Sequence, residues 1–372
     1  MKCKNRLLLI MALVVSVFFG CSNDTNIDEY KIGAILPLTG TGAEDGEFQK
    51  QGIDLAVAKI NKAGGVNGKL LKIIYEDSQN QAKMGISALN TILQRYKTPV
   101  VLSTMSGVSA PLASYAGGKV PAVLFVTVAS VPKITRHGDN IFRAFVTSDV
   151  ESHAIAEFMY KQGFRNMAVL YVNDDYGLGG KTEFYNEFER LGGNVVADEA
   201  YEKGTTNYRN LVVKTLAKKP DAVFVVGYDK SFALLVQQLG QMPDKVQLVT
   251  TSPLSVPSWR KLAGDAADGT YLANSWFRAN PDDPVTREFD DAYRAAYGKP
   301  SNYLSAAAYT SVMMIAEAIR TGGYSKEGIQ QALGKINNMS TLLGELSMSS
   351  EREAAFPVRM AQLIGGKVVN LE

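Results

Sequence analysis

The stretch from Lys31 to Asp77 constrains the fold more than any other part of the chain. It runs from an apolar segment, Ile32–Leu36, through a loop of small residues, Pro37–Gly46, into a helical segment and then a second apolar segment, Leu70–Tyr75. Two apolar strands joined by a helix form a βαβ unit, whose strands lie parallel in one sheet. The first loop is rich in glycine and lacks a catalytic set, which favours holding a molecule at the strand ends over transforming it.

The same alternation continues along the chain. Short, continuous apolar runs predict strands buried on both faces, and helical segments such as 179–191 and 230–239 separate them. Such runs are too numerous for one compact sheet, so we expect an α/β fold of two doubly wound lobes, each built on a parallel sheet. The further predicted strands are 99–102, 123–128, 166–171, 221–226 and 246–249.

Ser106, Ala129, Ser130 and Tyr228 follow the carboxyl ends of these predicted strands. In open parallel sheets ligands bind at that edge. Small and hydroxyl residues are also common in turns and helix caps, so position alone does not decide between the two roles.

The N-terminus carries the pattern of an export signal. An uncharged apolar run, Leu7–Phe19, follows three basic residues, Lys2, Lys4 and Arg6. This run is shorter than a typical membrane-spanning helix. The run stops just before Cys21, as in bacterial lipoprotein signals, in which this cysteine is lipidated and becomes the new N-terminus.

We therefore expect a signal peptide over residues 1–20, lipidation of Cys21 and a tether over residues 21–27. The residues just before Cys21 depart from the usual motif, so an ordinary secretory signal with no role for Cys21 is the alternative. The other cysteine, Cys3, lies inside the predicted signal, so the exported chain would have no disulfide, no cysteine metal site and no thiol nucleophile. The expected location is the cell envelope, on its periplasmic or extracellular face.

Charge is nearly balanced along the chain. There are 39 lysines and arginines against 37 aspartates and glutamates, and loss of the three basic residues in the predicted signal would leave 36 against 37. Without a basic excess, the sequence favours neither a nucleic acid nor an anionic membrane surface as a partner. No second apolar run is long enough to cross a bilayer.

Common motifs for nucleophilic or metal-dependent catalysis are absent from the sequence. The two histidines, His137 and His153, have no metal-ligand partner three or four residues away, and neither G-x-S-x-G nor H-E-x-x-H occurs. The run Gly177–Thr182 resembles the end of a phosphate-binding loop motif, but Asp175 occupies the position of the first glycine of that motif. We therefore interpret the run as a helix start. We expect no enzymatic activity, no cofactor and no metal.

Short motifs follow one another through the whole chain after the predicted signal. They are Ile32-Gly33 with Pro37–Gly40, Gly52–Ala56, Ala63–Gly68, Tyr75–Asp77, Phe142-Arg143, Asp174–Gly177, Ala263–Gly269 and Ala308-Tyr309. Each is weak alone, but their order and spacing resemble the type 1 periplasmic solute-binding proteins, in particular the leucine/isoleucine/valine-binding group of ABC-transporter receptors.

This resemblance implies two α/β lobes joined by three crossovers, with a ligand in the cleft between them and closure about a hinge. Lobe 1 would comprise residues 28–148 and 276–353, and lobe 2 residues 149–275 and 354–372. The resemblance also implies a membrane-embedded ABC permease as the partner, and we expect a monomer.

The resemblance also implies which residues bind the carboxylate group of the ligand. Ser106 matches the family's serine that binds it, while Val128, Ala129 and Ser130 match positions where a backbone carbonyl binds the ligand ammonium and a hydroxyl binds the carboxylate. A hydroxyl and backbone N–H groups near a helix start can hold an anion without a counter-charge. Ser106 can also cap the helix that follows it.

Three aromatic residues and one acid complete the expected cleft. Tyr176 and Tyr228 match the family's tyrosines that close over the ligand from lobe 2, and Tyr303 is a further candidate for the wall. Asp45 falls where the family places a residue facing the ligand side chain. As alternatives, each tyrosine can be a core-edge residue and Asp45 an ordinary loop acid.

Ser252 is the main departure from the family pattern. The amino-acid receptors have a glutamate here that pairs with the ligand ammonium, and a serine cannot supply that charge. Asp149, near the expected hinge, and Asp45 are the candidates to replace it. Otherwise the ligand would carry a carboxylate without an α-ammonium, as a keto, aliphatic or aromatic acid does.

The leading hypothesis is a lipid-anchored receptor that delivers a small carboxylate, an amino acid of branched-chain or other apolar type, to an ABC importer. The alternatives are a ligand-sensing regulatory lipoprotein of the envelope and a receptor for a non-amino organic or aromatic acid. An enzyme on this scaffold has the least support from the sequence.

Overall fold

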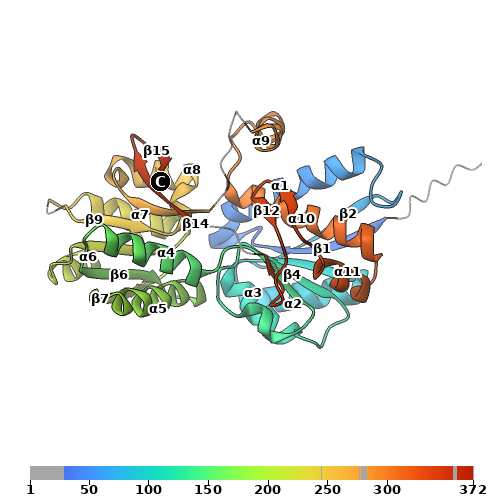
Figure 1. The fold of residues 1–372 in the computed structure, drawn as a ribbon, viewed down its shortest axis with the longest axis horizontal. Coiled ribbons are helices and arrows are strands. Elements are labelled where there is room, and N and C mark those ends of the chain that lie inside the picture. The colour runs from blue at the N-terminus through green and yellow to red at the C-terminus, as the bar shows by residue number, and fades with distance from the viewer. Residues whose placement is uncertain (1–28, 244, 276, 278–282, 355–357, 372) are drawn as a thin grey trace, which may run out of the picture.

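The computed structural model describes residues 29–371 apart from 244, 276, 278–282 and 355–357. The predicted signal peptide, the tether and Cys21 lie outside the described residues. Two sheets lie side by side along the long axis of the molecule, each flanked by helices (Figure 1). Within the described parts of the chain, no helix is long and apolar enough to span a membrane.

The first lobe is built on a parallel sheet of six described strands in the order β13-β5-β4-β3-β1-β2. These strands are β1 (Tyr30–Leu36), β2 (Leu71–Asp77), β3 (Val100–Thr104), β4 (Val123–Thr127), β5 (Ile141–Ala144) and β13 (Glu353–Ala354). Its helices are α1 (Ala43–Lys62), α2 (Ala82–Thr91), α3 (Ser106–Ala116), α9 (Pro284–Tyr297), α10 (Tyr303–Gly322) and α11 (Lys326–Leu333).

Helices cover both faces of this sheet because its strands are apolar on both sides. Ile32 and Leu36 of β1 belong to a core shared with α1 and α10, whereas Ile35 belongs to a second core shared with α2 and α3. Helices α1 and α10 approach closely at Gly52, where a Cβ would lie 2.1 Å from the carbonyl oxygen of Ser305.

The second lobe is built on seven described strands in the order β15-β14-β10-β9-β8-β6-β7. They are β6 (Asn166–Val172), β7 (Asn194–Tyr201), β8 (Ala222–Val226), β9 (Gln247–Thr250), β10 (Tyr271–Ser275), β14 (Val358–Ile364) and β15 (Lys367–Asn370). Its helices are α4 (Ser148–Lys161), α5 (Asp175–Arg190), α6 (Arg209–Leu216), α7 (Asp229–Gly240) and α8 (Pro257–Ala263).

One edge of the second sheet is antiparallel, which the prediction of purely parallel sheets did not include. Strand β14 pairs antiparallel with both β10 and β15. The turn between β14 and β15 is Gly365-Gly366, with φ angles of 54° and 72°. Glycine adopts such angles without steric cost, so a two-residue hairpin forms here instead of a crossover to a parallel strand.

Short elements complete the described structure. A small hairpin joins β11 (Met339–Thr341) to β12 (Gly344–Leu346). The remaining single turns are η1 (Gly40–Gly42), η2 (Ile92–Tyr96), η3 (Ile134–His137), η4 (Ser252–Ser255) and η5 (Gly264–Ala267).

Two helices begin earlier than the sequence predicted, because glycines lie inside them. Helix α1 begins at Ala43, within the predicted loop, and a Cβ on Gly46 would lie 2.0 Å from the Pro37 carbonyl oxygen. Helix α5 begins at Asp175 rather than 179, and a Cβ on Gly177 would lie 1.9 Å from the Val172 carbonyl oxygen. Both glycines permit close packing of a helix start on a strand end, and the interpretation of Gly177–Thr182 as helical is confirmed.

In the described structure the chain passes between the two lobes at three places: after β5, after β10 and after β13 (Figure 1). Ala354 pairs with Ala144 in the first sheet, one residue beyond the predicted end of lobe 1. The remaining lobe limits stay predictions.

Candidate ligand-binding site

The carboxyl ends of parallel strands from both lobes face a common cavity. Residues that follow β1, β3, β4 and β5 in the first lobe line it together with residues that follow β6, β8 and β9 in the second. This is the edge at which open parallel sheets bind ligands. The described lining comprises Asp45, Met105, Ser106, Val128, Ser130, Phe145, Tyr176, Tyr228, Ser252, Pro253, Tyr303 and Leu304.

The cavity volume is about 40 Å³. A buried water molecule needs at least ~10–15 Å³ of such space, so the cavity holds a few waters and not an amino acid. A solute of that size therefore gains access only when the two lobes move apart.

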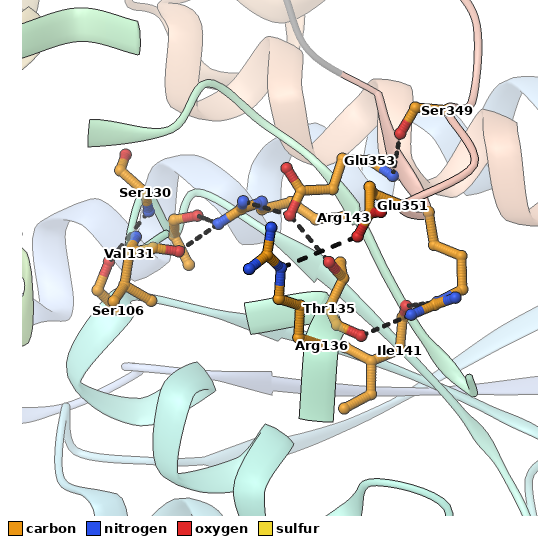
Figure 2. A network of polar contacts seen from close by, with 12 residues as sticks. Ser106, Ser130, Val131, Thr135, Arg136, Ile141, Arg143, Ser349, Glu351 and Glu353 are labelled. Atoms are coloured by element: carbon orange, nitrogen blue, oxygen red, sulfur yellow. Dashed lines mark hydrogen bonds and ion pairs between the residues drawn. The ribbon is translucent and has the colours of Figure 1, made fainter. Parts of the chain in front are cut away.

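Ser106 receives two backbone hydrogen bonds from the loop after β4. Its Oγ accepts from the N–H groups of Ser130 at 3.0 Å and Val131 at 3.3 Å (Figure 2). A serine hydroxyl can accept twice and donate once, so its proton is left to donate to a ligand oxygen. Ser106 is the first residue of α3, and no side chain caps this helix at Met105, so the alternative role of Ser106 as a cap is wrong.

Two non-glycine residues of the cavity have left-handed backbone conformations. Met105 has a φ of 67° and Val128 a φ of 47°, and the N–H of Met105 donates to the carbonyl of Val128 at 3.0 Å. A positive φ is a clear outlier for a β-branched residue such as valine. Strained conformations of this kind cluster at functional sites, because the surrounding structure must hold them in place. They also explain why β4 ends at Thr127, one residue before the predicted end.

Arg143 lies behind this loop and fixes its peptide groups. Its side chain is fully buried, and Nη1 donates to the carbonyl oxygens of Ala129 at 3.4 Å and Val131 at 2.5 Å (Figure 2). The Ala129 carbonyl and the Ser130 N–H belong to one planar trans peptide and point in opposite directions. Arg143 therefore turns the Ser130 N–H away from itself and toward Ser106.

The arginine is in turn held by the last strand of the first lobe. Nη2 of Arg143 donates to Oε1 of Glu353 at 2.6 Å, and Thr135 Oγ1 donates to the same carboxylate oxygen at 2.9 Å (Figure 2). Glu353 belongs to β13, directly before the third passage between the lobes. One polar network thus joins the 129–131 loop to this passage.

Tyr176 and Tyr228 form the second-lobe wall. Their rings meet edge to face with centroids 5.5 Å apart. The Tyr176 hydroxyl donates to Thr251 Oγ1 at 2.7 Å, and the Tyr228 hydroxyl donates to Asp174 Oδ2 at 2.5 Å. Burial raises the pKa of both phenols well above the usual value, so both remain neutral donors.

Asp174 explains why both tyrosines lie in place. Its Oδ1 caps α5 by accepting from the N–H groups of Tyr176 and Gly177, each at 3.1 Å. Its Oδ2 accepts from Tyr228 and from the ammonium group of Lys203, the latter at 3.3 Å. One carboxylate therefore positions the start of α5 and the hydroxyl end of Tyr228.

Ser252, in the cavity wall, is hydrogen-bonded to a buried glutamate of α4. Its Oγ donates to Oε1 of Glu151 at 2.7 Å, and Glu151 is only 1% exposed. Oε2 of Glu151 is buried without a hydrogen-bond partner among the described residues. Burial raises the pKa of Glu151 to about 7. A buried carboxyl group of α4 therefore lies next to Ser252, the position at which the resemblance led us to expect a glutamate.

Asp45 is a second buried carboxyl group, on the opposite lobe. It lines the cavity from the first turn of α1, is 4% exposed, and its Oδ1 has no hydrogen-bond partner among the described residues. Burial, followed by the nearby charges of Asp229 and Glu44, raises its pKa to about 7. Asp45 is thus a helical residue of the cavity wall rather than a loop acid.

Two of the predicted site residues do not reach the cavity lining. Ala129 belongs to the loop after β4, is buried, and its carbonyl oxygen accepts a hydrogen bond from Arg143. Asp149 is half-buried in the first turn of α4 and is absent from the described lining. The seven other predicted residues, and Tyr303, do line it.

Sequence reasoning missed the lining residues Met105, Phe145, Pro253 and Leu304, and it missed Glu151 behind Ser252. Phe145 stacks on Tyr303 with ring centroids 6.3 Å apart, so these two aromatics form one wall. A signal for Glu151 was present, because it lies two positions from Asp149, in a segment already singled out near the hinge. Deciding between the two acids required knowing which face of α4 meets the cavity.

Larger hollows lie elsewhere on the protein. One of about 530 Å³ is lined by α1, α9, α10 and β11, all from the first lobe, and includes the exposed Val285. The cavity between the lobes is the better candidate, because it joins strand ends from both sheets and borders two buried carboxyls. Within the described residues, no cluster of three or more histidine, cysteine, aspartate or glutamate side chains could hold a metal ion. Both histidines are exposed.

Comparison with known proteins identifies the family. The sequence model of a family described as periplasmic binding protein matches residues 29–367. The chain belongs to the periplasmic binding protein family. This membership confirms the resemblance seen in the sequence, and the two mostly parallel sheets confirm the predicted fold class.

Curated relatives span almost the same length as this periplasmic binding protein. The Leu/Ile/Val-binding protein BraC3 of Rhizobium johnstonii is 28% identical over 345 residues, which are 91% of this chain and 92% of that protein. The leucine-, isoleucine-, valine-, threonine-, and alanine-binding protein of Pseudomonas aeruginosa is 28% identical over 353 residues, 93% of this chain and 92% of that protein.

Solved structures share the fold. The branched-chain amino acid transporter substrate binding protein LivJ of Streptococcus pneumoniae, in complex with isoleucine, has a TM-score of 0.84 at 24% identity and covers 92% of this chain and 99% of its own. A solute binding protein of R. palustris in complex with benzoate has a TM-score of 0.84 at 20% identity. It covers 92% of this chain and 95% of its own. At these identities the likeness shows the fold alone.

Family membership also settles the class of activity. Periplasmic binding proteins capture a solute outside the cytoplasm, interact with a transporter permease and are not enzymes. The predictions of a non-enzymatic, extracytoplasmic solute-binding protein that serves an ABC importer are confirmed at this level.

Proposed function

We propose that this periplasmic binding protein captures a zwitterionic amino acid between its lobes and delivers it to an ABC permease. The observation that carries the proposal is the pairing of two complementary groups in one cavity. The Ser106 hydroxyl, which the N–H groups of Ser130 and Val131 orient, lines this cavity and suits an α-carboxylate. Glu151 lies behind the lining residue Ser252, whose hydroxyl donates to it, and suits an α-ammonium.

Glu151 favours a ligand that carries an ammonium group. A carboxyl group that is buried with one unpartnered oxygen is unfavourable until a donor or a cation reaches it. In the amino-acid receptors that the sequence resembles, a glutamate at the position of Ser252 binds this ammonium. Here the Ser252 hydroxyl orients Glu151 instead, so the charge comes from α4 rather than from the loop after β9.

The relatives and the lining support an amino acid with an apolar part. The proteins of R. johnstonii and P. aeruginosa are named for binding leucine, isoleucine and valine. Met105, Val128, Phe145 and Leu304 provide apolar surface in the cavity. Opening of the lobes admits the ligand, and contacts with both lobes then favour the closed state.

Isothermal titration calorimetry of the ligand-free protein against the twenty amino acids tests the proposal. We expect at least one amino acid to bind, with an affinity loss of tenfold or more in Ser106→Ala and in Glu151→Gln. Glu157→Gln, which removes an exposed carboxylate from the same helix, is the matched control and should bind as the parent does. Absence of binding by every amino acid would contradict the proposed function.

The variant Asp149→Asn tests which of the two acids of α4, Asp149 or Glu151, binds the ligand ammonium. If it weakens binding while Glu151→Gln does not, then Asp149 supplies the ammonium partner, as the sequence suggested, and the assignment to Glu151 is wrong.

A receptor for a non-amino organic or aromatic acid is the second candidate. The serine at position 252 favours it, and the R. palustris structure shows that this fold can hold benzoate in that protein. This candidate predicts binding of benzoate or a keto acid at an affinity that Glu151→Gln leaves unchanged or improves, because no ammonium then contacts the carboxylate.

We infer that Cys21 carries a lipid anchor and that the protein acts as a monomer. The position of Cys21 at the end of the apolar run supports the anchor. Metabolic labelling with a radioactive fatty acid should mark the parent protein and not Cys21→Ala. Sedimentation of the exported chain at micromolar concentration should give the mass of one subunit, and a concentration-dependent dimer would contradict the monomer.

A further inference from the structure

The cavity borders two carboxyl groups, one from each lobe. Asp45 lines it from α1 and Glu151 adjoins it through Ser252 from α4. The described lining includes no lysine, arginine or histidine. The charge of the cavity wall is therefore acidic on both sides, without a protein cation to balance it.

Each of these carboxyl groups has a buried oxygen that can accept a further hydrogen bond. Asp45 is 4% and Glu151 1% exposed, and each keeps one buried oxygen without a hydrogen-bond partner among the described residues. Tyr303 lies close enough to both for their charges to raise its pKa further, beyond the larger effect of its burial. Both acids therefore lie near one cavity residue, Asp45 in the lining itself and Glu151 behind Ser252.

Asp45 lies in the first turn of α1, where a carboxylate interacts favourably with the helix dipole, but that interaction does not require its burial. The cap position of this helix, Gly42, receives no side-chain hydrogen bond, and the charged neighbours that act on Asp45 are the acids Asp229 and Glu44. The indole N–H of Trp259, from the second lobe, acts on Asp45 as a hydrogen-bond donor and lowers its pKa, whereas Oδ1 keeps no hydrogen-bond partner among the described residues. A carboxyl group kept buried beside other acids is costly to the fold unless a ligand donor offsets it.

An aliphatic amino acid has a single group that can satisfy these acids. Its ammonium matches Glu151, and its hydrocarbon side chain would leave Oδ1 of Asp45 buried without a donor. A ligand with a second donor satisfies both carboxyls at once. This step rests on the function proposed above, because it takes the α-ammonium at Glu151 as given.

We propose that Asp45 determines side-chain specificity by accepting a hydrogen bond from a hydroxyl, amide or ammonium group on the ligand side chain. The protein then prefers an amino acid with a side-chain donor over an aliphatic one of the same shape. Discrimination of this kind is strong, because a wrong ligand leaves a buried polar group unpaired.

Pairs of amino acids with matched shape provide the test. Calorimetry of the ligand-free protein compares threonine with valine and asparagine with leucine, which differ mainly in the presence of a donor. We expect the donor-bearing member of at least one pair to bind at least tenfold more tightly. Asp45→Leu should remove or reverse this preference, and Glu47→Gln, at an exposed position of the same helix, should keep it.

The outcomes separate this inference from the proposed function. If valine and leucine bind at least as tightly as threonine and asparagine, the inference is overturned while the amino-acid receptor stands. If no amino acid binds, the proposed function fails and this inference with it. Asp45→Ala, which also removes the acceptor, serves as a second variant should Asp45→Leu not fold, and a preference unchanged in Asp45→Ala would also overturn the inference.

Discussion

Arg143 and Glu353 form a charge-assisted hydrogen bond of 2.6 Å that joins β5 to β13 across 210 positions of sequence. The arginine side chain is fully buried and the glutamate side chain is 21% exposed. The pair anchors the peptide group that carries the Ser130 N–H to the strand that precedes the third passage between the lobes. The strength of this pair therefore affects both the stability of the protein and the position of the loop that contacts Ser106.

Glu353→Gln should destabilise the protein markedly. Breaking a buried ion pair costs ~3–5 kcal/mol, and we expect about 2–3 kcal/mol here, because Glu353 is partly exposed and Arg143 keeps its carbonyl acceptors. Urea unfolding measures the change. Glu351→Gln is the control, because its ion pair with Arg136 at 3.9 Å is exposed and should contribute below ~1 kcal/mol. Equal effects of the two substitutions would show that burial of Arg143 does not matter.

Glu151 should make the ligand-free protein less stable as pH rises. Its folded pKa of about 7 lies above the ordinary value of 4.5, so the folded state binds the proton more tightly than the unfolded state. The stabilising contribution is complete below pH 4.5 and is lost as pH rises through 7. The shift corresponds to about 3 kcal/mol at ~1.4 kcal/mol per unit.

Unfolding of the ligand-free protein in urea at pH 5 and pH 8 measures this effect. Relative to the parent, Glu151→Gln should gain about 2–3 kcal/mol of stability between the two pH values, since glutamine does not titrate. Glu157→Gln, at an exposed site of α4, should run parallel to the parent. A parallel course for Glu151→Gln as well would mean that Glu151 is ionised at no cost in the folded protein.

Asp174→Ala should weaken both the fold and ligand binding. It removes the cap of α5, which is worth ~0.5–2 kcal/mol, and the acceptor of the Tyr228 hydroxyl. We expect a fall in unfolding free energy of about 2 kcal/mol and an affinity loss of several-fold or more. Asp283→Ala removes the cap of α9 outside the cavity and should lower stability without changing affinity. An unchanged affinity in Asp174→Ala would show that Tyr228 needs no anchoring.

Gly52→Ala should disrupt the packing of α1 on α10. The added Cβ would lie 2.1 Å from a backbone oxygen of Ser305, so one helix must shift. Overpacking of this kind costs ~1–3 kcal/mol, and thermal unfolding should show a correspondingly lower midpoint. Gly107→Ala, in helix α3 with open space around its Cβ, should be neutral or stabilising by up to ~1 kcal/mol. A neutral Gly52→Ala would show that the two helices can separate freely.

Much of the fold was predictable because it depends on local pattern. The apolar runs that became β1, β3, β4, β6, β8 and β9 are buried on both faces, and that burial requires continuous apolar sequence. Element limits were less accurate. The glycines of α1 and α5 resemble loop residues in sequence, yet each serves a close contact with a distant backbone atom.

Most of the candidate site was predictable for a different reason. Ser106, Ser130, Tyr176, Tyr228 and Ser252 each follow a strand, and parallel strands bring their carboxyl ends together at one edge. In the sequence, Arg143 was recognised only as part of the Phe142-Arg143 motif. Its role depends on the carbonyls of the 129–131 loop and on Glu353, which no local pattern connects.

By itself, the sequence determined the two-lobed α/β architecture, the family and the strand ends at which a ligand would lie, because these follow from hydrophobic periodicity and the order of short motifs. The tertiary structure decided which acids face the cavity. Residues 149 and 151 differ by about 200° around an α-helix, so they lie on different faces of α4, and Glu151 is the one that contacts Ser252. That choice depends on how α4 packs against the second sheet, which is a property of the assembled lobes and not of the segment.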